Sequence, residues 1–78
     1  MPPRRPVRAL HSPKYRAFVK RLIQAREQRG LTQAEVARSL NRPQSFVSKC
    51  ETGQRRVDVV ELQEFSRVYR VPLDFFVR

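Results

Sequence analysis

The sequence predicts a small all-α domain of five short helices. Apolar residues recur every three or four positions along most of the chain, which is the period of a helix with one buried face. Two Thr/Asp-x-x-Glu capping boxes, at Thr32 with Glu35 and at Asp58 with Glu61, mark helix starts. Seventy-eight residues make one domain, so the helices must share a single compact core.

The charge of the chain favours a polyanionic partner. It has 17 Lys and Arg against 7 Asp and Glu, a formal net charge of +10. Fourteen of these cations are Arg, which binds phosphate and guanine in a bidentate way. A surface that is basic only for solubility would carry the same charge. Charge alone therefore does not distinguish it from a nucleic-acid-binding surface, and a specific motif is needed.

Several other classes of protein are disfavoured. No apolar run approaches the about 20 residues that span a bilayer, and the N-terminus lacks the apolar centre of a signal peptide. The single cysteine cannot form an internal disulfide. We therefore expect a cytoplasmic protein, encoded by a bacterium or a phage.

Residues 1–13 are predicted to be a disordered, Pro-rich basic arm, and residues 14–78 the folded domain. The arginines of the arm are Arg4, Arg5 and Arg8. They either enter the minor groove of a duplex or merely spread charge, and both alternatives stay open.

The first helix is expected from about Lys14 to Arg29, with Ser12 as its N-cap and Gly30 as its left-handed C-terminal residue. Its buried stripe consists of Tyr15, Phe18, Val19, Leu22 and Ala25.

Residues 31–53 predict two short helices joined by a tight turn. The first is capped by Thr32, residues 41–43 form the turn, and the second helix spans about Gln44 to Thr52 before Gly53. The inward residues are Val36, Ala37, Leu40, Val47 and Cys50, while Gln44, Ser45, Ser48 and Lys49 face outward.

The fourth helix begins after Asp58 and carries Leu62, Phe65, Val68 and Tyr69 on its apolar face. Residues 71–72 (Val-Pro) end this helix, and residues 73–76 begin a short fifth helix that stops at Arg78.

The outward residues of the third helix suit the edges of DNA bases. Gln44 can pair with adenine, Lys49 can reach guanine and Ser45 can bond either base type in the major groove. We expect phosphate contacts from Gln33, in the first turn of the second helix, and from the arginines on both sides of the third helix, Arg42, Arg55 and Arg56. A merely solvated helix face is the competing interpretation.

Enzymatic activity is not expected. The sequence has no paired carboxylates, no Cys–His arrangement and, with two glycines, no phosphate-cradling loop. His11 has no partner ligands, so neither a metal nor another cofactor is expected.

Residues 31–37 (LTQAEVA) and 48–53 (SKCETG), followed by V-P-L-D at residues 71–74, resemble the helix-turn-helix signature of the phage repressor (Cro/cI-like, XRE) family. The resemblance covers about residues 18–76. It implies a five-helix bundle of the lambda-repressor-like type that binds operator DNA, usually as a symmetric dimer.

The resemblance also implies residue roles. Gln33 would contact phosphate and brace Gln44, and the base-facing set would be Gln44, Ser45, Ser48 and Lys49. Arg26 and Glu51 stand where many members form a buried ion pair. The sequence departs from the family pattern at Asn41, where Gly is commonest, at Pro43, which replaces a Ser/Thr cap, and at Cys50, which replaces a larger apolar residue.

Together these features predict a sequence-specific regulator of transcription, a repressor, that binds duplex DNA as a homodimer. The third helix of each protomer would read the bases, and these two reading helices would lie about 34 Å apart. Two alternatives stay open. The chain is an antitoxin or a restriction-system controller that also binds a protein partner such as a toxin, or it is an adaptor that joins proteins.

Overall fold

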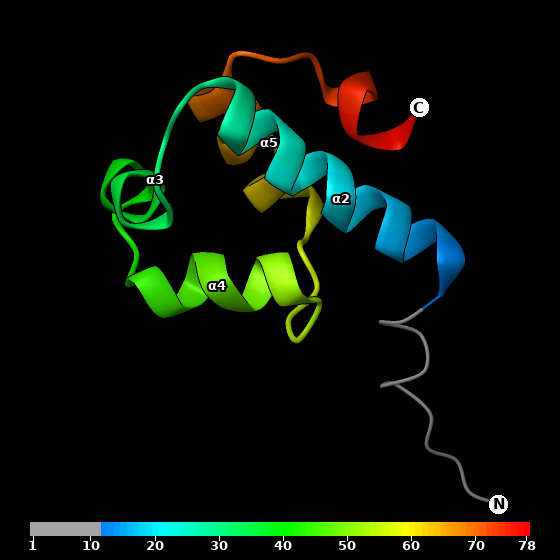
Figure 1. The fold of residues 1–78 in the computed structure, drawn as a ribbon, viewed down its shortest axis with the longest axis horizontal. Coiled ribbons are helices and arrows are strands. Elements are labelled where there is room, and N and C mark those ends of the chain that lie inside the picture. Colours follow the sequence, from blue (N-terminus) through cyan, green and yellow to red (C-terminus); the bar gives the residue numbers. More distant parts are fainter. Residues whose placement is uncertain (1–11) are drawn as a thin grey trace, which may run out of the picture.

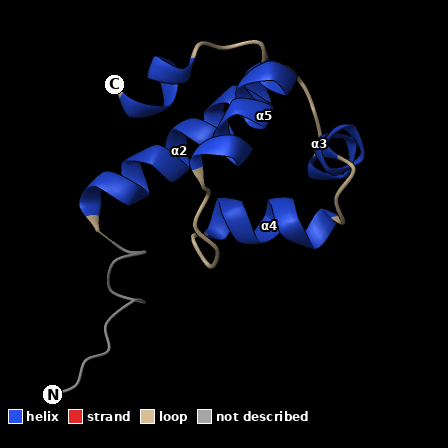
Figure 2. Cartoon of the chain, turned by 180° about the vertical axis from the view of Figure 1, so that it is seen from behind, coloured by secondary structure: helices blue, strands red, loops and turns tan. Residues whose placement is uncertain are grey.

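The computed structural model describes residues 12–78, which form four α-helices and one 3-10 helix (Figure 1). The α-helices cover Pro13–Gln28 (α2), Gln33–Leu40 (α3), Gln44–Thr52 (α4) and Val59–Tyr69 (α5), and the 3-10 helix covers Leu73–Val77 (η1). Within this part of the chain the regular elements are all helical and the loops are short (Figure 2), so the all-α prediction is confirmed. The predictions for Arg4, Arg5, Arg8 and His11 lie outside the described residues.

The predicted short fifth helix is the 3-10 helix η1, so the described residues form four α-helices and not the five-helix bundle that was expected. The Phe75 amide donates to the Pro72 carbonyl at 3.0 Å, which is the i to i+3 pattern of a 3-10 turn. Phe76, only 1% exposed, anchors this turn in the core.

The helix ends follow the local signals in the sequence. The Ser12 hydroxyl accepts a hydrogen bond from the Tyr15 amide at 3.2 Å, and both predicted capping boxes are formed. Asn41 has a φ of +59°, which lets the chain turn sharply between α3 and α4. Arg70, with a φ of +57°, takes the same left-handed conformation after α5, which the sequence did not indicate.

The core lies where α2, α3, α4 and α5 meet. Its fully buried members include Leu22 from α2, Val36 from α3, Val47 from α4 and Phe65 from α5, each 0% exposed. In Figure 1, α3 is seen end-on while α4 lies in the plane, so these two consecutive helices cross steeply. This crossing leaves α4 along one edge of the molecule, with one side packed on the core.

Candidate nucleic-acid interface

The α4 helix has one buried and one open side. Phe46, Val47, Cys50 and Glu51 are buried, whereas Gln44, Ser45 and Lys49 are exposed and Ser48 is partly exposed. We call the second set, Gln44, Ser45, Ser48 and Lys49, the α4 polar face. The structure thus places the four predicted base-facing residues on one open surface of α4, whose opposite side packs on the core.

The first turn of α4 also has backbone donors to offer. Pro43 occupies the N-cap and makes no side-chain hydrogen bond to the amides of the turn. Since the first amides of a helix point along its axis and carry partial positive charge, this end suits an anion such as a phosphate. With Pro43 in place of a Ser or Thr cap, α4 still begins at Gln44, as the sequence predicts.

Glu51 joins α4 to the two preceding helices. Its carboxylate accepts hydrogen bonds from Arg26 Nε at 2.7 Å and Arg26 Nη2 at 3.1 Å. Arg26 Nη1 donates in turn to the Leu31 carbonyl at 2.8 Å. The side chain of Glu51 is 4% exposed, and its hydrogen bonds raise the pKa of Arg26 above the usual range, so the guanidinium stays charged. The structure brings together the two residues that the family resemblance implies.

Gln33 belongs to the same cluster. Its Nε2 donates to Glu51 Oε1 at 2.9 Å. The side-chain amide of Gln33 is thus anchored to α4 through Glu51, and its oxygen remains available as an acceptor. Contacts of Gln33 with phosphate and with Gln44 stay predictions.

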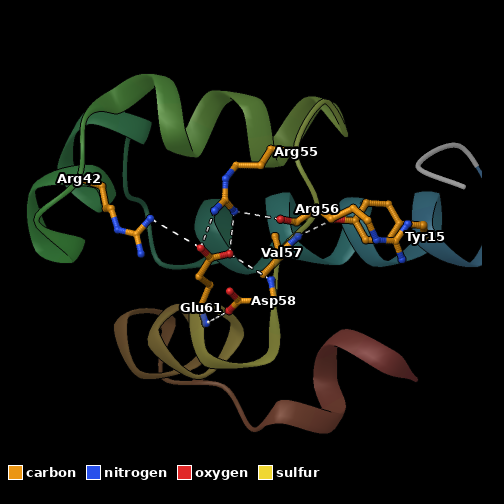
Figure 3. Close-up of polar contacts among 7 residues, drawn as sticks. All are labelled: Tyr15, Arg42, Arg55, Arg56, Val57, Asp58 and Glu61. Carbon is orange, nitrogen blue, oxygen red and sulfur yellow. Dashed lines mark hydrogen bonds and ion pairs between the residues drawn. The ribbon is translucent and has the colours of Figure 1, made fainter. Parts of the chain in front are cut away.

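A second carboxylate, that of Glu61 on α5, forms ion pairs with the arginines that flank α4 (Figure 3). Arg55 Nη1 and Nη2 donate to Glu61 Oε1 and Oε2 at 2.7 and 2.8 Å, and Arg42 Nη1 lies 3.6 Å from Oε2. The Asp58 amide donates to Oε1 at 3.0 Å. The Arg55 hydrogen bonds lower the pKa of Glu61, whose side chain is 6% exposed.

Most of the hydrogen-bonding capacity of the Arg55 guanidinium is therefore used within the protein, although its side chain is 41% exposed. Its Nη1 also donates to the Arg56 carbonyl at 2.9 Å, so three of the five N–H groups of a guanidinium are used. A phosphate contact by Arg55 stays a prediction, and it would have to use the remaining two.

Arg56 is held differently. Its guanidinium lies 4.6 Å from the centre of the Tyr15 ring, and the Tyr15 hydroxyl accepts a hydrogen bond from the Val57 amide at 3.0 Å (Figure 3). Stacking on a ring orients a guanidinium and leaves its N–H edge available. Among the four predicted phosphate-binding residues, Arg56 is thus exposed and already oriented.

Sequence reasoning missed the cluster around Glu61. Glu61 was recognised only as the acceptor of a capping box, and Arg42 and Arg55 only as cations beside the third helix. One signal was present in the sequence. Glu61 stands at the start of an amphipathic helix and only six residues after Arg55, so an acidic side chain follows closely on a basic loop.

Cys50 lies behind the α4 polar face and is fully buried. Burial raises the pKa of its thiol to about 11, so the thiol stays protonated and acts as a small apolar side chain.

A compact helical domain that presents polar and cationic side chains on the second helix of a helix–turn–helix unit has the architecture of a DNA-binding module. Residues 17–74 match the family model described as a helix-turn-helix domain, and the chain belongs to this family. The family implies DNA binding and a role in the regulation of transcription. No curated protein matches the chain.

Across residues 12–78 the structure has no helix with the length and apolar character needed to cross a membrane.

Proposed function

We propose that this protein is a transcriptional repressor of the phage repressor (XRE) type, acting in the cytoplasm, that reads duplex DNA in the major groove with the α4 polar face. The supporting observation is the division of α4 into two sides: Val47 and Cys50 are 0% exposed, while Gln44 and Lys49 lie in the open. A helix buried on one side and amide-bearing and cationic on the other fits the width and the donor–acceptor pattern of that groove.

Phosphate contacts on both sides of α4 would set its register. Arg42 precedes the helix, and Arg56 follows it in an orientation set by the Tyr15 ring. Within residues 12–78 the Arg42 guanidinium forms no hydrogen bond, and its ion pair with Glu61 spans 3.6 Å. Arg42 also lies over the Phe46 ring at 4.3 Å, which leaves its N–H groups open to a phosphate, whereas Arg55 would first have to leave a bidentate pair.

We also propose that the protein binds DNA as a homodimer. Four large apolar side chains are exposed near the start of α5 and in η1: Val59, Val60, Leu73 and Val77, between 42% and 71%. Val59 and Val77 line one groove together with Phe18 and Leu62. A second copy would remove such surface from water, and a two-fold arrangement places two reading helices on one palindromic site.

The test is selection of binding sites from random duplex DNA, followed by titration of the enriched duplex. We expect a palindromic consensus and two protomers per site. Gln44→Ala and Lys49→Ala should each weaken binding about 10-fold or more and relax the preference at one base position.

The matched controls are Gln63→Ala on α5 and Lys20→Ala on α2, which make the same changes at exposed positions outside α4. They should leave the consensus unchanged. Absence of enrichment with the folded wild-type protein would refute sequence-specific reading. Repression, as opposed to activation, is tested by placing the consensus across a reporter promoter and measuring whether expression falls.

A further inference from the structure

Glu61, on α5, contacts one arginine before α4 and one arginine after it. Arg42 stands in the turn before α4 and Arg55 in the loop after it, and the Glu61 carboxylate receives both (Figure 3). A nine-residue helix is about 14 Å long, so one carboxylate on α5 ties segments that are separated by the full length of α4.

The carboxylate is itself fixed. It accepts from the Asp58 amide at 3.0 Å, while the Asp58 side chain accepts from the Glu61 amide at 2.8 Å. This reciprocal capping box holds the Glu61 side chain against the first turn of α5. Arg55 therefore bonds to an acceptor that moves only when α5 moves.

The same two arginines lie against a residue of α4. The guanidinium carbons of Arg42 and Arg55 are 4.3 and 4.8 Å from the centre of the Phe46 ring. The Phe46 ring is stacked on Phe65 of α5 at 6.1 Å with an interplanar angle of 6°. Phe46 follows Ser45 directly, so the packing of its ring fixes the first turn of α4 against α5.

We propose that Glu61 is a positioning residue for sequence reading: through Arg55, Arg42 and the Phe46 ring it sets the place of the first turn of α4 against DNA. This inference rests on the proposed function, because it assigns Glu61 a part in that function. The ion pair favours a specific duplex over other duplexes and does not supply the general attraction to DNA. Loss of the carboxylate releases two cations that any phosphate can bind, while the base-facing side chains lose their alignment.

The experiment compares Glu61→Gln with Glu64→Gln. Gln can still accept from the Asp58 amide, so the capping box is kept while the ion pairs are lost. Glu64 is one turn further along α5, and its replacement removes the same charge. Both variants and the wild type are titrated with the selected duplex and with a scrambled duplex of equal length, at one salt concentration and at a temperature where circular dichroism shows them folded.

For Glu61→Gln we expect the ratio of the two affinities to fall about 10-fold, with binding to the scrambled duplex unchanged or tighter. For Glu64→Gln the ratio should equal that of the wild type. Equal weakening on both duplexes would overturn the inference, because it would show that Glu61 affects the general affinity for DNA and not the preference for one sequence. An unchanged ratio would overturn it as well.

Arg55→Lys provides a second, independent test if Glu61→Gln does not fold. It keeps the net charge and the Glu61 carboxylate but removes the bidentate geometry, and it should lower the affinity ratio in the same direction. A wild-type ratio maintained in folded Arg55→Lys would contradict the inference. The proposed function fails in a different way, since the wild type itself would then show no preference for any duplex.

Discussion

Replacement of Glu51 by Ala should cost this domain about 3 kcal/mol of its free energy of unfolding. The Glu51 carboxylate is 4% exposed and accepts three hydrogen bonds, two from Arg26 and one from Gln33, at 2.7, 3.1 and 2.9 Å. Its removal leaves the Arg26 guanidinium, 16% exposed, without its carboxylate. Breaking a buried pair from one side costs about 3–5 kcal/mol, and the partial exposure of Arg26 favours the lower end.

This loss is large for a chain of this length. At about 0.05–0.15 kcal/mol per residue, 78 residues give a total stability of about 4–12 kcal/mol. With a urea m-value of about 1 kcal/mol/M, a loss of 3 kcal/mol moves the unfolding midpoint down by about 3 M. The assay is urea titration followed by circular dichroism at 222 nm, with Glu27→Ala, an exposed change on α2, as the control.

A double replacement separates the two explanations of such a loss. In Arg26→Met/Glu51→Leu neither charge is left behind, so the free energy of unfolding should recover to within about 1–2 kcal/mol of the wild-type value. A Glu51→Ala midpoint equal to that of Glu27→Ala would refute the reasoning, and so would a double variant no more stable than Glu51→Ala.

Three further outcomes follow from the same structure. Because Arg55 lowers the pKa of Glu61 in the folded state, this carboxylate stabilises the fold fully above the pKa of a free glutamate, about 4.3. That stability is lost as the pH falls through the lower folded-state pKa, so Glu61→Gln should flatten the decline of the urea midpoint below about pH 5, and an unaltered decline would contradict this. Burial raises the pKa of the Cys50 thiol to about 11, so a disulfide reagent at pH 8 should label it slowly in buffer and rapidly in urea; immediate labelling of the folded protein would show the thiol to be accessible. Arg70 has a φ of +57°, a conformation that costs a side chain about 1 kcal/mol, so Arg70→Gly should leave the urea midpoint unchanged or raise it, and a clear decrease would contradict the assignment of strain.

The local elements of this fold are well predicted because each depends on residues close in the chain. The capping boxes at Thr32 and Asp58 form as expected, and α4 covers residues 44–52 as predicted. The last helix is different: residues 73–77 form a 3-10 turn because the burial of Phe76 against α2 and α5 decides their conformation. Apolar spacing over five residues does not distinguish the two kinds of helix.

The candidate site was predictable to a similar extent. Outward and inward sides of α4 follow from helical spacing, and the Arg26–Glu51 pair was implied by the family resemblance. The partners of Arg42 and Arg55 were not predictable, since Glu61 meets them only after α5 has folded back beneath α4. The same holds for Arg56, whose orientation depends on Tyr15, 41 positions earlier in the chain.

By itself, the sequence determined where the helices begin and end, which side of each is apolar, and that a basic helix–turn–helix unit lies at residues 31–53, because these properties arise from backbone capping and from side chains three or four residues apart. Only the tertiary structure decided how the cations are used. Arg55 is bound to Glu61, Arg56 is stacked on Tyr15, and Arg42 keeps a longer ion pair. The physical reason is that an ion pair depends on the distance between two charges in space, and that distance is set by the packing of α5 on α3 and of Phe65 on Phe46.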